Sequence, residues 1–466
     1  MIPTLRYALR KLAIVGLGKS GLSAARALSA DGAKVLVWDD NPDARQKAAE
    51  AGYTVVEPNE NSWSDVDRVI WSPGIPHTHP KPHPLAQLAA RLGKPMVCDV
   101  DLLCDTNTQP FYVGITGTNG KSTTTALITH ILKSAGQQAE AAGNIGIPAL
   151  DSPTLGMTGT YVLELSSYQL ELVPSLRLDV AVWTNITPDH LDRHGGMDGY
   201  VTAKRRLFQN QKYPSHAVIG VDDDYSARVC AELIRQGGSQ VIPVSVTRAV
   251  ENGVYVKDGM LIDATGRRPQ EICDLREMKT LPGAHNWQNA ALAYAASRCR
   301  GVSLPRILDA LRSFPGLPHR QQLVAVIEDV AFINDSKATN ADAASKALGC
   351  YTDVLWIAGG KAKEGGIASL APLFPRIKHA FLIGESANDF AAVLKAANVP
   401  CTISGTLENA VEQADEMADH GDTVLLSPAC ASFDQFRSFE HRGEVFMDIV
   451  HELEEEDDDG DDGSAA

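Results

Sequence analysis

Residues 111–122 read FYVGITGTNGKS, and the order of residue types in this stretch decides the local fold. The apolar run FYVGIT predicts a buried strand, and the following TTTALITHILKSAG predicts a helix that ends at Gly136. A glycine-rich turn between a strand and a helix lets backbone N–H groups point at phosphate oxygens. The turn is therefore predicted to bind nucleotide phosphates through Gly117, Thr118, Asn119, Gly120, Lys121 and Ser122.

The side chains at the end of this turn have distinct expected roles. Lys121 would neutralise charge on the β- and γ-phosphates, and the Ser122 hydroxyl would coordinate Mg²⁺. The full G-x-x-x-x-G-K-[ST] pattern is not met, because Ile115 stands where its first glycine belongs. An ordinary glycine turn is the alternative, but it explains the strand, the GKS and the helix together less well. The type of nucleotide stays open.

Alternation of apolar strands, turns and helical stretches continues on both sides of this segment. KLAIVGLG, AKVLVWDD and RVIWSPG precede it, and VAFINDS, VLWIAGG, AFLIGES and DTVLLSPA follow. Such alternation predicts an α/β fold with parallel sheets. We expect three domains at residues 1–108, 109–316 and 317–453, followed by a disordered acidic tail at 454–466.

Composition narrows the class of protein. The formal net charge of −16 disfavours a nucleic-acid partner, because phosphate backbones are bound by basic faces. The chain contains no apolar run long enough to span a membrane, and its start does not resemble a signal peptide, so we expect a cytoplasmic protein. Eight scattered cysteines without a CxxC pair favour reduced, packed thiols.

Two further polar residues follow predicted strands near the phosphate-binding turn. Glu164 ends the strand in VLELSSYQLE, where a carboxylate could hold Mg²⁺ beside the phosphates. His190 lies in TNITPDHLDRHG, on the loop after another strand, where sites of α/β proteins assemble. The alternatives are a helix-capping acid and an incidental loop histidine.

The N-terminal segment contains a second glycine-rich turn. Residues 16–21 read GLGKSG after a strand, and Asp39 follows the next strand, which matches a dinucleotide fingerprint. The pattern indicates a backbone suited to a pyrophosphate without specifying the nucleotide. Lys19 and Ser20 could equally serve a UDP diphosphate. Farther along, HTHPKPHP at 77–84 is interpreted as a solvated loop rather than a metal site.

Two loops of the third segment concentrate small and polar residues. NDSKATN at 334–340 follows a strand, and a solvated helix-capping turn is its alternative reading. SPACASFDQF at 427–436 also follows a strand, and its small residues leave amides and the Ser432 hydroxyl available for an anionic ligand. Cys430 is interpreted as a packed thiol, because no neighbouring residue would activate it.

Taken in order, ITGTNGKSTTT, LELSSYQLE, TNITPDHLDRH, GAHNWQNAALA, GLPHR and NDSKATN resemble the Mur ligase family. The resemblance covers the whole chain except the acidic tail. SPACASFDQFRSFEHRG and GLGKSGLS are most similar to members that add glutamate to a UDP-linked peptidoglycan precursor. It implies a Rossmann-like UDP-binding domain, a central P-loop-type ATPase domain and a Rossmann-like C-terminal domain.

The resemblance also implies a reaction. ATP would phosphorylate the L-alanyl carboxylate of UDP-N-acetylmuramoyl-L-alanine, and the amino group of D-glutamate would attack the acyl phosphate. Mg²⁺, with two ions expected, would assist, and the enzyme would act as a monomer. Such chemistry needs charge neutralisation and positioning more than a nucleophile on the protein.

The resemblance further assigns residues to roles. The catalytic residues would be Lys121, Glu164, His190 and Lys204. The metal ligands would be Ser122, Glu164, His190 and Lys204 as a carbamate. Besides the phosphate-binding turn, ATP would contact Asn286, Asn289, Arg320 and Asp335. The UDP substrate would contact Leu17, Lys19, Ser20, Asp39, Ser72, Pro73, Gly74 and Asn144. The amino acid would contact Lys337, Thr339, Lys361, Ser432 and Phe439.

Other functions remain as alternatives. A related ligase could add another amino acid, including L-glutamate, but the N-terminal turn and the SPACAS segment argue against a folylpolyglutamate synthase. A nicotinamide-dependent oxidoreductase could use the GLGKSG turn, but it would leave the GTNGKS turn and Glu164 without a role. A non-catalytic nucleotide-binding module would bind ATP without releasing phosphate.

Overall fold

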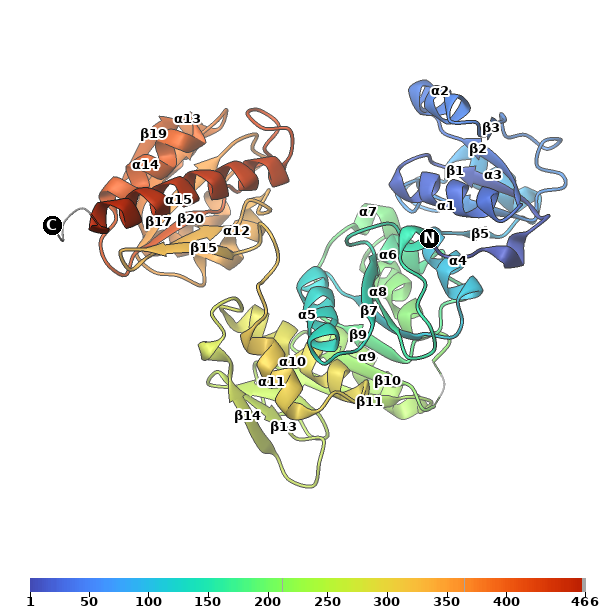
Figure 1. Cartoon of the computed structure of the whole chain (residues 1–466), viewed down its shortest axis with the longest axis horizontal. Coiled ribbons are helices and arrows are strands. Elements are labelled where there is room, and N and C mark those ends of the chain that lie inside the picture. The colour runs from blue at the N-terminus through green and yellow to red at the C-terminus, as the bar shows by residue number, and fades with distance from the viewer. Residues whose placement is uncertain (212, 364, 463–466) are drawn as a thin grey trace. The chain divides into compact units, whose positions relative to one another are not determined.

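The computed structural model describes residues 1–211, 213–363 and 365–462, and three sheets organise the chain (Figure 1). The first two sheets form one compact unit, Met1–Met278 with Ala284–Phe314. The third belongs to a second unit, which consists of Lys279–Gly283 and the chain from Pro315 onward. The predicted three-part α/β fold is confirmed.

The first sheet is entirely parallel, with strand order β3-β2-β1-β4-β5. Its strands are β1 (Lys11–Val15), β2 (Lys34–Trp38), β3 (Thr54–Val55), β4 (Arg68–Trp71) and β5 (Met96–Val97). Its helices are α1 (Lys19–Ala30), α2 (Pro42–Glu50), α3 (Pro84–Arg91) and α4 (Asp99–Thr106). Because β2, β1 and β4 are neighbours and parallel, the loops that follow them lie at one edge of the sheet.

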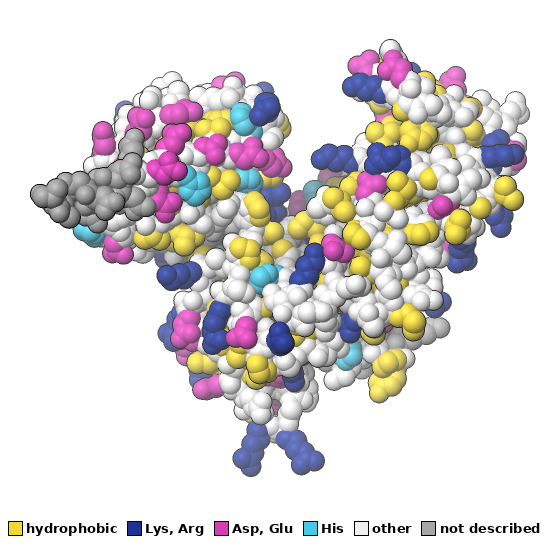
Figure 2. Space-filling model, in the orientation of Figure 1, with side chains coloured by type: hydrophobic (Ala, Val, Ile, Leu, Met, Phe, Trp, Pro, Cys, Tyr) yellow, Lys and Arg dark blue, Asp and Glu magenta, His cyan; other side chains and the backbone are white. Residues whose placement is uncertain are grey.

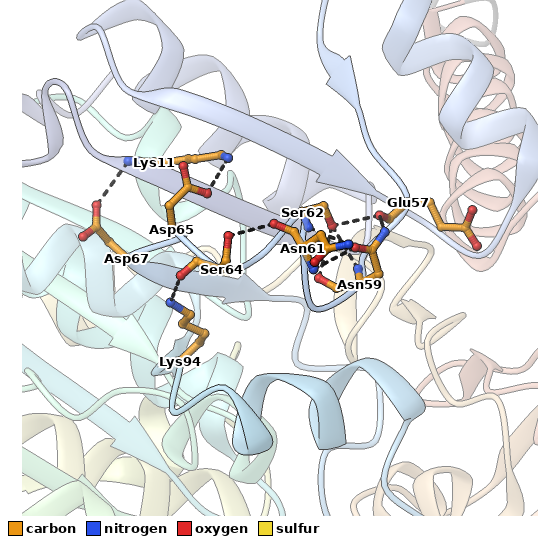
Figure 3. A network of polar contacts seen from close by, with 9 residues as sticks. All are labelled: Lys11, Glu57, Asn59, Asn61, Ser62, Ser64, Asp65, Asp67 and Lys94. Atoms are coloured by element: carbon orange, nitrogen blue, oxygen red, sulfur yellow. Dashed lines mark hydrogen bonds and ion pairs between the residues drawn. The ribbon is translucent and has the colours of Figure 1, made fainter.

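The connection between β3 and β4 is fixed by its own polar groups (Figure 3). The Asn59 side chain accepts hydrogen bonds from the amides of Asn61 and Ser62, both at 2.9 Å. Lys94 donates to the Ser64 carbonyl at 2.8 Å, and Lys11 pairs with Asp65 at 2.6 Å. This Asx-type turn therefore closes the end of the sheet opposite to the loops described above.

The second sheet has the order β14-β13-β12-β11-β10-β9-β6-β8-β7, and only β12-β13-β14 pair antiparallel. Its strands are β6 (Phe111–Thr116), β7 (Ala139–Gly143), β8 (Thr160–Glu164), β9 (Val180–Trp183), β10 (His216–Gly220), β11 (Gln240–Ser245), β12 (Val254–Lys257), β13 (Met260–Asp263) and β14 (Gln270–Asp274). Its helices are α5 (Lys121–Ser134), α6 (Ser167–Leu170), α7 (Leu191–His194), α8 (Met197–Arg205), α9 (Asp224–Gln236), α10 (Ala284–Cys299) and α11 (Leu304–Arg312). One hydrophobic core joins it to the first sheet.

The third sheet has the order β15-β16-β20-β17-β18-β19, antiparallel only between β15 and β16. Its strands are β15 (Gln322–Ile327), β16 (Val330–Asn334), β17 (Val354–Gly359), β18 (Ile377–Ile383), β19 (Cys401–Gly405) and β20 (Thr423–Leu426). Its helices are α12 (Ala341–Leu348), α13 (Ala387–Ala396), α14 (Leu407–Met417) and α15 (Phe439–Asp462). Separate apolar clusters cover its two faces, so it is a complete core.

Helix α15 reaches into the segment that the sequence predicted to be an acidic tail. The structure continues the helix to Asp462, whereas disorder was expected from residue 454; residues 463–466 lie outside the described part. Val450 and Leu453 pack into the core, and glutamate has high helix propensity, so the acidic run extends a helix already anchored.

Surface charge on the C-terminal unit is predominantly acidic on the face shown in Figure 2. Helices α14 and α15 of this unit carry exposed acidic side chains, among them Glu408, Glu412, Glu416, Glu440, Glu444 and Asp448. Within the described residues, the structure contains no helix with the length and apolar character needed to cross a membrane.

Candidate active site

The predicted phosphate-binding turn lies between β6 and α5, as its residue types require. Gly117 and Gly120 have φ values of +154° and +83°, which side chains rarely tolerate. A Cβ at Gly117 would overlap the Thr184 hydroxyl, and one at Gly120 would overlap the Asn289 side chain. Both glycines are therefore required by backbone conformation and by the close approach of neighbours.

The turn is held in place by the loop that follows β9. The amides of Thr118 and Asn119 donate to the carbonyl and side-chain oxygens of Asn185, at 2.9 and 3.0 Å. Thr184 donates to the Asn119 carbonyl at 2.6 Å. Two backbone donors are thus occupied within the protein, and the turn's shape is set before any ligand binds.

Two lysines converge on the same carbonyl of this turn. Lys121 donates to the Gly117 carbonyl at 3.1 Å, and Lys204 donates to it at 2.7 Å. Lys204 projects from α8 and is almost fully buried. Burial, together with the nearby charge of Lys121, holds the pKa of Lys204 well below its usual range. Its amine therefore loses a proton far more readily than a surface lysine.

Glu164 lies on the strand next to this turn, with an unsatisfied oxygen. Glu164 of β8 pairs with Ile115 of β6, and the Glu164 side chain is buried. Asn144, which follows β7, donates to its Oε1 at 3.0 Å, whereas Oε2 has no hydrogen-bond partner. An unpartnered buried carboxylate oxygen is costly unless a cation or donor completes it.

His190 starts α7 in a left-handed backbone conformation, with φ of +52°. Its Nε2 lies 3.4 Å from Asp189, and its ring packs 5.1 Å from that of Tyr168. The Tyr200 hydroxyl contacts the Thr118 hydroxyl at 3.2 Å, and its ring lies 4.7 Å from the Lys204 ammonium. An aromatic floor therefore connects the histidine with the phosphate-binding turn.

This donor set fits a divalent cation in part. The orphaned Glu164 oxygen, the Ser122 hydroxyl at the start of α5 and the His190 imidazole are suitable ligand types. Among the described residues, no three His, Cys, Asp or Glu side chains group closely enough to hold a metal ion. A carbamate on Lys204 would add the anionic oxygens that the unmodified side chains lack.

Helix α10 supplies the predicted contacts on the far side of the turn. Thr124 of α5 donates to the Asn289 side chain at 3.2 Å, and Asn289 donates to Asn286 at 3.2 Å. Both asparagines are buried, and the Asn289 side chain lies next to Gly120. The predicted ATP contacts Asn286 and Asn289 thus adjoin the phosphate-binding turn, whereas Arg320 and Asp335 belong to the C-terminal unit.

The predicted UDP contacts meet at one edge of the first sheet, except Asn144. Leu17 donates its amide to Asp39 at 2.7 Å, and a Cβ at Gly16 would meet Ser72. Lys19 is exposed at the start of α1. The turn after β1, Asp39 after β2 and the Ser72–Pro73–Gly74 loop after β4 are therefore neighbours. Asn144 instead lies beside Glu164 in the second sheet.

In the C-terminal unit, the loops after β16, β17 and β20 also share an edge. Lys361 pairs with Ala431 through backbone hydrogen bonds, and the Lys337 ammonium lies 4.4 Å from the Phe439 ring centre. The Ser432 hydroxyl is buried without a partner. Thr339 follows in the same loop as Lys337. Four of the five predicted amino-acid contacts thus come from loops that meet at this edge, Phe439 begins α15 beside Lys337, and the Ser432 hydroxyl is unsatisfied.

Asp335, at the end of β16, is a buried carboxylate with internal partners. It accepts hydrogen bonds from the Ser427 hydroxyl at 2.7 Å and the Gln321 amide at 3.2 Å. Burial raises the pKa of Asp335 to about 7, and these hydrogen bonds offset only part of that effect. Its charge is therefore sensitive to pH in the neutral range.

Comparison with known proteins decides the family. Three family models match in order: the Mur ligase MurD-like N-terminal domain at residues 10–95, the Mur ligase middle domain at 115–297 and the Mur ligase glutamate ligase domain at 319–430. A UDP-N-acetylmuramoylalanine–D-glutamate ligase of Rhodospirillum rubrum is 54% identical over 97% of both chains. The chain belongs to the Mur ligase family. A relative of the same name from Caulobacter vibrioides is 50% identical over 97% of this Mur ligase and 98% of that protein.

Solved structures agree at the level of the fold. MurF of Acinetobacter baumannii has a TM-score of 0.58 at 18% identity, covering 97% of this Mur ligase and 93% of that chain. UDP-N-acetylmuramate–alanine ligase MurC of Thermotoga maritima has a TM-score of 0.57 at 18% identity, covering 95% and 99%. These similarities support the three-part architecture and no finer property.

Several residues of this Mur ligase site were missed from the sequence. Tyr168 and Tyr200 form the aromatic floor, and Asn185 shapes the phosphate-binding turn. The buried Arg442 donates to the carbonyls of Ser336 and Cys430, joining two loops of the amino-acid edge. Asn185 lies in the TNITPDH segment and could have been found as a polar residue after a strand. The others carry no local signal, because their roles depend on distant partners.

The HTHPKPHP loop was expected to be solvated, but the structure covers part of it. His77 is largely covered and lies 3.5 Å from Glu171, and His83 lies 2.8 Å from Asp40. The prolines exclude a helix but leave the loop free to pack against the second sheet's helices.

Proposed function

We propose that this Mur ligase forms an amide bond between the L-alanyl carboxylate of UDP-N-acetylmuramoyl-L-alanine and the amino group of D-glutamate, using ATP, in peptidoglycan precursor synthesis. The observation that carries the proposal is the pair of lysines around the Gly117 carbonyl beside an unsatisfied, buried Glu164. Relatives with this name match nearly the whole chain at about half identity, which supports the same substrates here.

The proposed mechanism depends on charge and position. Lys121, the Gly120 amide and the first amides of α5 would bind the triphosphate, and the α5 N-terminus would add to their field. The substrate carboxylate would attack the γ-phosphorus, and ADP would leave. The neutral amine of glutamate would then attack the acyl phosphate, lose a proton and expel phosphate. Each step asks the protein to hold reacting atoms together and neutralise charge.

Mg²⁺, when bound, would neutralise phosphate charge. Glu164 would hold it through Oε2, with Ser122 and His190 as further ligands, and Asn144 would keep the carboxylate oriented through Oε1. The neutral amine is the form of lysine that adds to carbon dioxide, giving a carbamate and releasing a proton, so the lowered pKa of Lys204 favours this modification. We propose two ions on this basis, because a second anionic ligand would then face the turn.

The other substrates would bind at the remaining two edges. The UDP group would contact Leu17, Lys19, Ser20, Asp39 and the Ser72–Pro73–Gly74 loop, with Asn144 nearer the reacting end. Glutamate would use Lys337 and Lys361 for its carboxylates and the Ser432 hydroxyl as a donor, beside Thr339 and Phe439. Asn286, Asn289, Arg320 and Asp335 would contact the rest of ATP.

Some wider assignments accompany this function. We propose domain bounds at 108/109 and 316/317, action as a monomer and a cytoplasmic location. The location follows from nucleotide-linked substrates and from cysteines that suit a reducing compartment.

One assay tests the proposal directly. Phosphate release would be measured with UDP-N-acetylmuramoyl-L-alanine, ATP and Mg²⁺, adding D-glutamate in one series and L-glutamate in another. We expect release only with D-glutamate and only when every component is present. Release with L-glutamate alone would move the assignment to a related ligase, and release without an amino acid would reject amide formation.

A further inference from the structure

The loop that follows β4 is docked onto α7 by one buried arginine. Arg193 donates to the carbonyls of Ile75 at 3.0 Å, His79 at 3.3 Å and Pro73 at 3.5 Å. Its side chain is only 5% exposed, so these carbonyls replace water as acceptors for the guanidinium. Hydrogen bonds from a buried charged donor are stronger than neutral ones, and three of them hold one short loop.

Further contacts support the same docking. A Cβ at Gly195 would lie 2.9 Å from the His79 ring nitrogen, so the glycine that ends α7 lets this histidine pack on bare backbone. His77 lies 3.5 Å from Glu171, and Glu171 lies 3.5 Å from His194 at the end of the same helix. The loop is therefore seated on α7 along its length rather than at one point.

The other end of α7 carries the proposed metal ligand. His190 is the N-cap residue before Leu191, and the four residues of the helix rise only about 6 Å. The Tyr168 ring contacts both side chains: the Arg193 guanidinium lies 5.0 Å from its centre, and the His190 ring lies 5.1 Å from it. A shift of the loop would therefore act on the histidine through a single helical turn and a shared ring.

We propose that Arg193 is a positioning residue that fixes the loop holding the UDP substrate to the helical turn that presents His190. The inference rests on the proposed function, because that function makes Ser72–Pro73–Gly74 a substrate contact and His190 a metal ligand. Arg193 sets the distance between the bound precursor and the reacting phosphate without touching either. Its fork of donors satisfies three carbonyls at once, which an ammonium group cannot do.

The test compares Arg193→Met and Arg193→Lys with the matched control Arg26→Met. Arg26 also joins the first sheet to the second, through Asp151 at 2.8 Å, but away from α7. We expect Arg193→Met to raise KM for the UDP substrate about tenfold to hundredfold and to lower kcat. KM for D-glutamate, whose contacts lie in the other unit, should stay within about twofold. Arg193→Lys should fall between, and Arg26→Met should match the unchanged protein.

Amide hydrogen exchange of residues 72–83 gives a second measurement that needs no substrate. We expect faster exchange there in Arg193→Met and not in Arg26→Met. If Arg193→Met does not fold, Arg193→Lys keeps the positive charge but not the fork of donors, and a smaller rise in KM for the UDP substrate with faster exchange of residues 72–83 is expected from it.

Three results would overturn the proposal: unchanged exchange in the loop, faster exchange without a change in KM for the UDP substrate, or equal changes in KM for all three substrates. Failure of the proposed function is distinguishable, because the unchanged protein would then release no phosphate while the exchange measurement would still decide whether Arg193 fixes the loop.

Discussion

Two glycine-rich turns in this chain have the same local design and different surroundings. Each follows a parallel strand and begins a helix, at Gly16–Gly21 and Gly117–Ser122. Around the second, Lys121 and Lys204 converge on one carbonyl beside the buried Glu164. Around the first, Asp39 accepts a hydrogen bond from the Leu17 amide, and Lys19, the lysine of this turn, is exposed.

A glycine-rich turn alone therefore does not determine which ligand binds. A triphosphate with a metal needs a positive counter-charge and an anionic metal ligand, which Lys121 and Glu164 supply at the second turn. At the first turn, Asp39 already accepts the hydrogen bond that the Leu17 amide can donate, and its charge would repel a phosphate placed there. This favours a ligand whose diphosphate lies toward α1. Neighbouring elements, rather than the glycine pattern, separate the two sites.

The largest expected effect comes from removing the lysine of the second turn. Lys121→Ala should lower substrate-dependent phosphate release by about a thousandfold or more, because the γ-phosphate loses its main counter-charge. Lys19→Ala, the equivalent change at the first turn, should raise KM for the UDP substrate only about threefold to tenfold. Steady-state kinetics of the two variants would measure these effects, and equal losses of activity would contradict different roles for the two turns.

Removing Lys204 should also cause a large loss of activity, but added carboxylates should restore part of it. Lys204→Ala should lower kcat about a hundredfold, and formate or acetate should restore part of it if a carbamate oxygen is what the site lacks. The control is Lys133→Ala on the exposed side of α5, where Lys133 pairs with Glu140. Unchanged activity of Lys204→Ala, or no rescue at any carboxylate concentration, would reject the carbamate.

Strand-end carboxylates extend the comparison to the third sheet. The pKa of Asp335 is raised to about 7 by burial, so as pH rises the unfolded chain loses this proton before the folded one. Its destabilising effect thus grows from about pH 4 to pH 7 and is constant above. Asp335→Asn should stabilise the C-terminal unit by up to about 4 kcal/mol at pH 8 and by almost nothing at pH 4.

Chemical denaturation followed by hydrogen exchange of β16 and β20 would measure this difference. Activity should fall in the same variant, because Asp335 is a proposed ATP contact. A stability gain that is independent of pH would show that the carboxylate is not the group responsible.

The smallest effects separate the glycines of the two turns. Gly120 has φ of +83° and a neighbour where Cβ would lie, so Gly120→Ala should destabilise the first unit by about 2 kcal/mol and weaken ATP binding. Gly18 has φ of −70° and open space around it, so Gly18→Ala should change stability by less than about 0.5 kcal/mol. Thermal unfolding checks both, and equal shifts would contradict the assignment.

The strand–turn–helix units, the three-part α/β fold and the family could all be predicted from the sequence, because apolar periodicity, glycine turns and ordered motifs are local signals. The start of the acidic tail at residue 454 stays a prediction, because the helix that enters this segment is anchored by Val450 and Leu453 through contacts that the local charge pattern does not reveal. The histidine-rich loop was predicted to be solvated, although packing of His77 depends on a helix far along the chain.

Tertiary structure alone decided how the polar residues act together. Lys204 meets the Gly117 carbonyl from 87 residues away, and Arg193 reaches Ile75 from 118 residues away. No spacing rule predicts such pairs, because parallel strands bring their following loops together whatever their separation in sequence. Burial then changes the chemistry of the side chains it brings together: it makes Lys204 a weak base and leaves Glu164 an oxygen without a partner.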